Sequence, residues 1–82
     1  MKHKEKIYAL LEELIEGQKK TLMNCAQSMI PHLTYDDILQ PNDYAELEVN
    51  PLFRYEEGVL SGMKTVQTAL FALFQENPDI VD

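Results

Sequence analysis

Apolar residues recur every three or four positions along the first third of the chain. The main row is Ile7, Leu11, Leu14, Leu22, Cys25 and Met29, and Gln18 stands where its missing member would fall. A second row widens the stripe, as in helices that pack into a core: Tyr8, Ile15, Leu22, Ala26 and Ile30. This periodicity predicts an α-helix over residues 4–30. Pro31 ends it, because proline disfavours helical geometry at the preceding residue.

The last third of the chain repeats the pattern, with clearer ends. Asn50 and Pro51 are typical of an N-cap followed by the first helical residue, and a second Asn-Pro pair ends the helix before a short tail, residues 77–82. The pattern therefore predicts a helix over residues 51–76. Its apolar row is Leu52, Tyr55, Val59, Met63, Val66, Leu70 and Leu73.

Residues 31–50 connect the two helices. A structureless loop of that length would be unusual in a small domain, and residues 34–39 and 43–47 resemble short capped helical turns. No strand-like alternation occurs. We therefore expect an all-α fold, an antiparallel helical hairpin with a partly helical connector, in one domain spanning 1–82. The connector residues expected to cover the helices are Ile38, Leu39, Tyr44, Leu47 and Val49.

The apolar stripes are wider than a two-helix contact can cover. A chain of 82 residues also buries a small fraction of its surface, so its stability is marginal without further support. Cys25 is the only cysteine, which excludes a disulfide within one chain. Oligomerisation is the natural support that remains. The stripes therefore predict a homodimer in which two hairpins form a four-helix bundle.

A row of small residues runs beside the apolar face of the second helix. Each glycine inside a helix costs about 1 kcal/mol relative to alanine, which favours close approach of another helix at this row. The alternative is that the glycines are tolerated on an exposed face. The residues predicted for a helix–helix or dimer interface are Gly17, Gly58, Ser61, Gly62, Thr65, Ala69 and Ala72, with the neighbouring Val59, Met63, Val66 and Leu70.

A polar stretch, residues 16–21, interrupts the apolar stripe of the first helix. It is compatible with a kink, with a buried polar contact that fixes register, or with a solvated stretch over a thinner core. A buried Gln18 would need hydrogen-bonding partners for its amide.

The chain is strongly acidic, with fourteen acidic and seven basic residues and a net charge of −7. This excludes the basic footprint of a nucleic-acid-binding protein. The connector has no lysine or arginine between Thr34 and Phe53, which indicates either a docking surface for a basic partner or a solvated loop. The acidic residues of this candidate docking surface are Asp36, Asp37, Asp43, Glu46 and Glu48. Their spacing does not match a calcium-binding loop.

No motif predicts catalysis, a cofactor or a metal, so we expect no enzyme activity. Cys25 lies on the apolar stripe and is interpreted as a structural thiol, while His32 stands beside a proline as a candidate cap of the chain reversal. No segment approaches the roughly 20 apolar residues of a membrane span. The N-terminal apolar run, residues 7–11, is also too short for a signal-peptide core, so we expect a cytoplasmic protein.

The leading functional hypothesis is a non-enzymatic protein–protein interaction module, such as an adaptor, a small chaperone or a regulatory subunit. A second hypothesis is a domain that binds a small ligand or a divalent metal where His32, Asp36, Asp37 and Tyr55 would converge. A third is an obligate subunit of a larger complex, which would need the same exposed stripe as self-association.

Overall fold

The computed structural model describes residues 2–79, so the end of the predicted tail, residues 80–82, lies outside the described residues. Its elements in chain order are α1 (Lys2–Met29), α2 (Tyr35–Ile38), the 3-10 helix η1 (Pro41–Asp43), α3 (Ala45–Glu48) and α4 (Pro51–Glu76). The described chain is all-helical and elongated, with extents of 47 × 18 × 17 Å. None of its helices is both long enough and apolar enough to span a bilayer.

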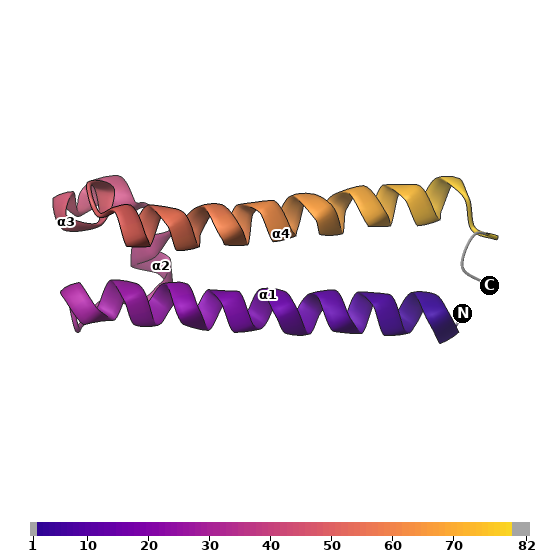
Figure 1. Ribbon diagram of the computed structural model, residues 1–82, viewed down its shortest axis with the longest axis horizontal. Coiled ribbons are helices and arrows are strands. Elements are labelled where there is room, and N and C mark those ends of the chain that lie inside the picture. Colours follow the sequence, from indigo (N-terminus) through magenta and orange to yellow (C-terminus); the bar gives the residue numbers. More distant parts are fainter. Residues whose placement is uncertain (1, 80–82) are drawn as a thin grey trace.

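The two long helices form the predicted hairpin. Figure 1 shows α1 and α4 running antiparallel along the whole molecule, joined at one end by the connector. The Asn50 side chain caps α4 by accepting a hydrogen bond from the Phe53 backbone N–H at 2.8 Å, and Pro51 follows at the first helical position. At the other end of the hairpin's turn, α1 ends at Met29 and the next residue, Ile30, is buried.

The connector holds two short α-helices, as expected, and one 3-10 turn that the sequence did not reveal. The helix α2 begins at a capping box. The Asp37 backbone N–H donates to the Thr34 hydroxyl oxygen at 3.4 Å, and the Asp37 carboxylate accepts from the Thr34 backbone N–H at 2.9 Å. The unforeseen turn, η1, starts at Pro41. Proline fixes its own φ near a helical value, which favours such a turn.

Most of the buried side chains lie where the connector meets the long helices. The continuous core cluster consists of Ile15, Leu22, Ala26, Ile30, Leu33, Ile38, Leu47, Phe53 and Leu60. Of the connector residues expected to cover the helices, Ile38 and Leu47 are buried and Tyr44 is half-buried. The expectation is wrong for Val49, which follows the last residue of α3 and is 78% exposed. Leu39, which follows α2, is 59% exposed but lines a groove together with Leu22 and Leu60.

The polar stretch of α1 makes a contact between the helices. The Gln18 side-chain amide donates to the backbone carbonyl of Glu56 at 3.0 Å and to its carboxylate at 3.2 Å. Gln18 is half-buried and α1 is continuous through it, so the structure favours the register-fixing contact over a kink or a solvated stretch.

Candidate functional site

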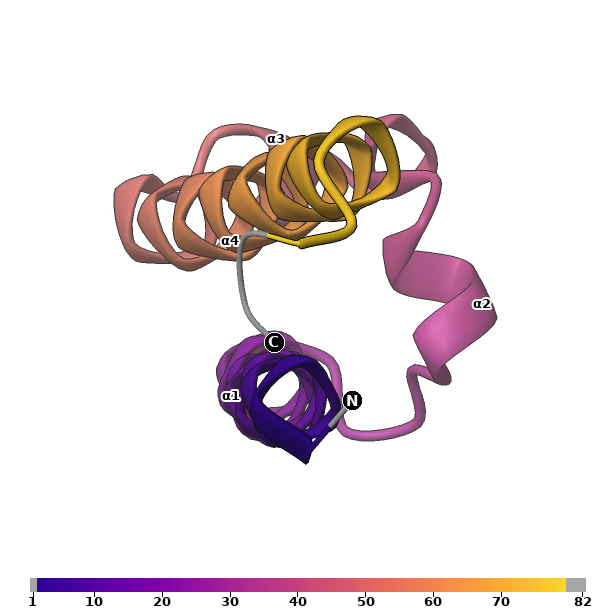
Figure 2. The same cartoon turned by 90° about the vertical axis from the view of Figure 1, so that its right-hand side faces the viewer.

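The connector covers only one of the two sides of the hairpin. Figure 2 shows α2 beside the pair of long helices, on one side of the seam between α1 and α4. A groove remains on that side between α2 and α4, which we call the connector groove. On the other side of the seam, no element of the described chain covers the long helices. We call that surface the open flank and define it by Leu10, Leu14, Gly62 and Val66.

The open flank is apolar and accessible. A hollow of about 260 Å³ lies at its centre and is lined by Leu11, Leu14, Ile15, Gly62, Met63 and Val66. Large side chains around it remain in solvent, because Leu10 is 56%, Leu14 49% and Val66 52% exposed. An exposed apolar surface of this kind, contributed by two elements, marks an interaction site more often than isolated exposed residues do.

None of the residues that line the hollow of the open flank is charged. The charged residues of α4 from Arg54 to Lys64 have contacts away from the hollow of the open flank. Arg54 donates to the Glu57 carboxylate at 2.8 Å, Glu56 accepts from Gln18, and Lys64 lines the connector groove. Another apolar surface could therefore contact the open flank without leaving a charge of α4 buried and unpaired.

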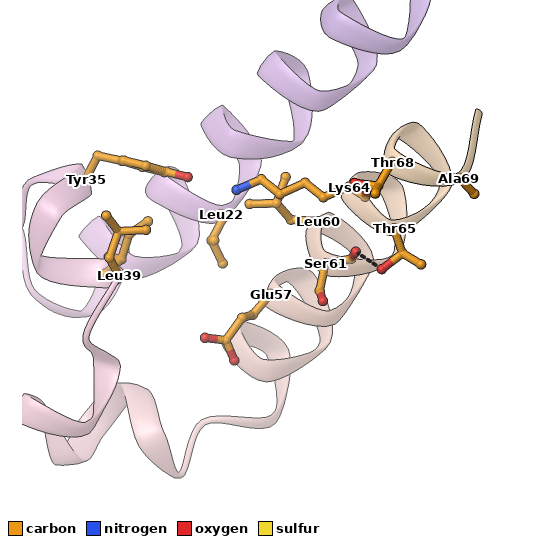
Figure 3. A pocket seen from close by; sticks show the side chains of 11 residues that line it. Leu22, Tyr35, Leu39, Glu57, Leu60, Ser61, Lys64, Thr65, Thr68 and Ala69 are labelled. Carbon is orange, nitrogen blue, oxygen red and sulfur yellow. Dashed lines mark hydrogen bonds between the residues drawn. The ribbon is translucent and has the colours of Figure 1, made fainter. Parts of the chain in front are cut away.

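The connector groove has a different character. Its volume is about 640 Å³, and it is lined by Leu22, Tyr35, Ile38, Leu39, Glu57, Leu60, Ser61, Lys64, Thr65, Thr68 and Ala69. Figure 3 shows Lys64 extending from α4 across the groove toward Tyr35. Leucines form its floor, and the hydroxyl groups on α4 are engaged along the helix, since Thr65 donates to the Ser61 carbonyl and Thr68 to the Lys64 carbonyl, each at 3.0 Å.

Six of the eleven predicted interface residues line the hollow of the open flank or the connector groove, and the other five line neither: Gly17, Gly58, Val59, Leu70 and Ala72. Gly62, Met63 and Val66 lie on the open flank, whereas Ser61, Thr65 and Ala69 line the connector groove. A Cβ placed on any of the three glycines would meet no atom within 4 Å, so the packing of α1 against α4 does not require glycine at these positions. Their role against a second chain remains a prediction.

The acidic residues of the connector do not gather into one site. Asp37 is engaged in the capping box, where the Thr34 backbone hydrogen bond holds the pKa of its carboxyl below the usual value. Asp36, Asp43, Glu46 and Glu48 are exposed. Within residues 2–79, no three histidine, cysteine or acidic side chains come together as metal ligands. Docking of a basic partner here remains a prediction.

Cys25 packs against the buried core cluster and is half-buried. Burial raises the pKa of its thiol, and the nearby Glu56 carboxylate raises it further. A thiol kept protonated in this way is a poor nucleophile, which agrees with its interpretation as a structural side chain.

One feature of the candidate surfaces was not visible in the sequence. The connector groove depends on where α2 lies over α1 and α4, and no local pattern specifies that position. The Gln18–Glu56 contact did have a signal, since Gln18 occupies an apolar position of the helical row. Comparison with protein families, with characterised proteins and with solved structures finds no match to this chain.

Proposed function

We propose that this protein is a non-enzymatic protein-interaction module, and that its open flank binds a second copy to form a four-helix bundle. The observation that carries this proposal is the uncovered apolar side of the hairpin, with Leu10, Leu14 and Val66 about half exposed. Two hairpins packed through such sides bury both stripes in one core, which is a familiar helical architecture.

The energetic argument rests on apolar area. Burial contributes roughly 25 cal/mol for each Å² of apolar surface removed from water, so a flank that runs along two long helices offers a substantial driving force for association. The net charge of −7 opposes association in general, but the hollow at the centre of the flank is lined by no charged residue.

The test is solution mass over a wide range of protein concentration, measured by light scattering behind size exclusion. We expect a dimer of twice the 9.5 kDa chain mass. Val66→Glu should shift the protein to monomer, because it would bury a carboxylate in the interface. Thr68→Glu adds the same charge in the connector groove and should leave the dimer intact.

Two outcomes contradict the proposal. One is a wild-type monomer at every concentration, which would favour a different protein chain as the partner. The other is equal dissociation by both glutamate variants, which would mean that added charge, and not the open flank, controls association. Because Val66 and Thr68 are both exposed in the single chain, helicity should be unchanged in both variants and separates dissociation from unfolding.

A further inference from the structure

Two oppositely charged residues of α1, Glu13 and Lys20, form no ion pair within the part of the chain that the structure describes. Within residues 2–79 the ion pairs join Lys19 to Glu16 and Arg54 to Glu57, which leaves Glu13 and Lys20 of α1 unpaired and exposed. Glu13 stands four residues before Gly17 and Lys20 three after it, so all three share one face of the helix.

This face borders the open flank. Leu10 precedes Glu13 by three residues and Leu14 precedes Gly17 by three, so Glu13 adjoins an exposed leucine directly and Lys20 adjoins Gly17, which itself neighbours Leu14. Glu13 and Lys20 themselves stand seven residues apart. At 1.5 Å of rise per residue they are about 10 Å from each other along the helix, too far to pair within one chain.

The three glycines lie in the same part of the hairpin, between two contacts that join α1 to α4. Gln18 bonds to Glu56 and Gln67 to Glu12, so Gly17 lies opposite the stretch of α4 between those contacts, which holds Gly58 and Gly62. None of the three glycines has a positive φ, and a Cβ on any of them would meet no atom within 4 Å. The fold of the single chain therefore does not require glycine in this part of the hairpin.

We infer that the second copy lies antiparallel on the open flank, with α1 beside α1 of the other copy and the twofold axis passing next to Gly17. This inference rests on the proposed function. In a twofold contact, if residue i meets residue j, then j also meets i. An axis midway between Glu13 and Lys20 therefore joins Glu13 to Lys20 of the second copy, and Lys20 to Glu13 of the second copy.

Charge complementarity selects this arrangement over the other way of pairing two hairpins. If α1 instead lay beside α4 of the second copy, Glu13 and Lys20 would face the open-flank side of α4, and no charged residue of α4 lines the hollow there. With α1 beside α1, both charges are neutralised at the border of an apolar contact. The same axis passes next to Gly17, where a Cβ would meet no atom of the single chain within 4 Å.

Charge reversal tests the inference through the dimer dissociation constant, measured by analytical ultracentrifugation of Glu13→Lys, Lys20→Glu and the double variant. Each single variant places like charges together twice, and we expect about tenfold weaker association. The double variant restores both pairs and should return to within about threefold of the wild type. The loss in the single variants should shrink in 0.5 M salt, because salt screens exposed charges.

Glu13→Lys is the decisive single variant. It lowers the magnitude of the net charge from −7 to −5, since one acid is lost and one base is gained, so general repulsion predicts tighter association. The matched control is Glu46→Lys. It makes the same change in net charge at an exposed residue of α3, in the connector, and should not weaken the dimer.

A wild-type monomer would overturn both this inference and the proposed function. A wild-type dimer that Glu13→Lys does not weaken, or that the double variant does not restore, would overturn only the arrangement. A second measurement reports geometry directly. In a Cys25→Ala background, Glu13→Cys mixed with Lys20→Cys should form an intermolecular disulfide faster than either variant alone, and equal rates would contradict the antiparallel pairing.

Discussion

The two halves of this hairpin differ in how completely they bury their apolar residues. In the half near the connector, residues from α1, α2, α3 and α4 share one core, and the Phe53 and Leu47 side chains are fully buried. Among the described residues of the other half, Phe74 alone is buried, and it lies beside a Tyr8–Phe71 ring contact with centroids 4.5 Å apart. The two long helices form a well-buried core where the short helices of the connector pack over them.

The largest effect should follow from removing the centre of the connector half. Phe53→Ala deletes a fully buried aromatic ring and should lower the free energy of unfolding by about 3–5 kcal/mol. Leu73→Ala in the other half removes an exposed side chain and should cost far less in the single chain. Urea unfolding of both variants at one low protein concentration measures the contrast. Equal losses would mean that the two halves are equally well packed.

A smaller effect is expected from the capping box that starts α2. Thr34→Ala removes a cap and should lower the free energy of unfolding by about 1 kcal/mol at neutral pH. The folded-state pKa of Asp37 lies below its unfolded value near 3.9, so the contribution of this carboxylate is present above pH 4 and is lost as the pH falls through the lowered pKa.

Asp37→Asn keeps an oxygen that can accept from the Thr34 backbone N–H but carries no charge, so it should be less stable than the wild type at neutral pH and should converge with it in strong acid. Melting curves between pH 2 and 7 follow this difference, with Asp36→Asn in the same short helix as the control because Asp36 takes no part in the box. A difference that persists unchanged at the lowest pH would contradict the role given to Asp37.

The smallest effect is expected from Gly62→Ala, which should raise the stability of the single chain and weaken association of the dimer. Gly62→Ala adds a methyl group that meets no atom within 4 Å in the single chain, so it should stabilise the helix by roughly 0.5–1 kcal/mol. In the proposed dimer, the same methyl group would stand in the contact and weaken association. Melting at low concentration and ultracentrifugation at high concentration separate the two signs, and a stabilised dimer would contradict close approach at Gly62.

The sequence predicts the long helices well because their signals are local. The Asn50-Pro51 pair specifies the start of α4 by a cap that acts over three residues, and the hairpin follows from two stripes of matched length. The exposure of Leu39 and the groove beside Lys64 depend on how the connector turns in space, which no short-range pattern encodes. The homodimer, its interface and the docking of a partner at the connector remain predictions.

Gln18 also bears on how the chain selects one alignment among several similar ones. Leucines spaced by three and four residues resemble themselves after a shift of one or two helical turns, so apolar contacts alone would tolerate a sliding of α1 along α4. A half-buried amide bonded to Glu56 does not tolerate it, because sliding would leave a polar group inside without a partner. The leucines would therefore stabilise several alignments of α1 along α4, and the hydrogen bonds of Gln18 select one of them.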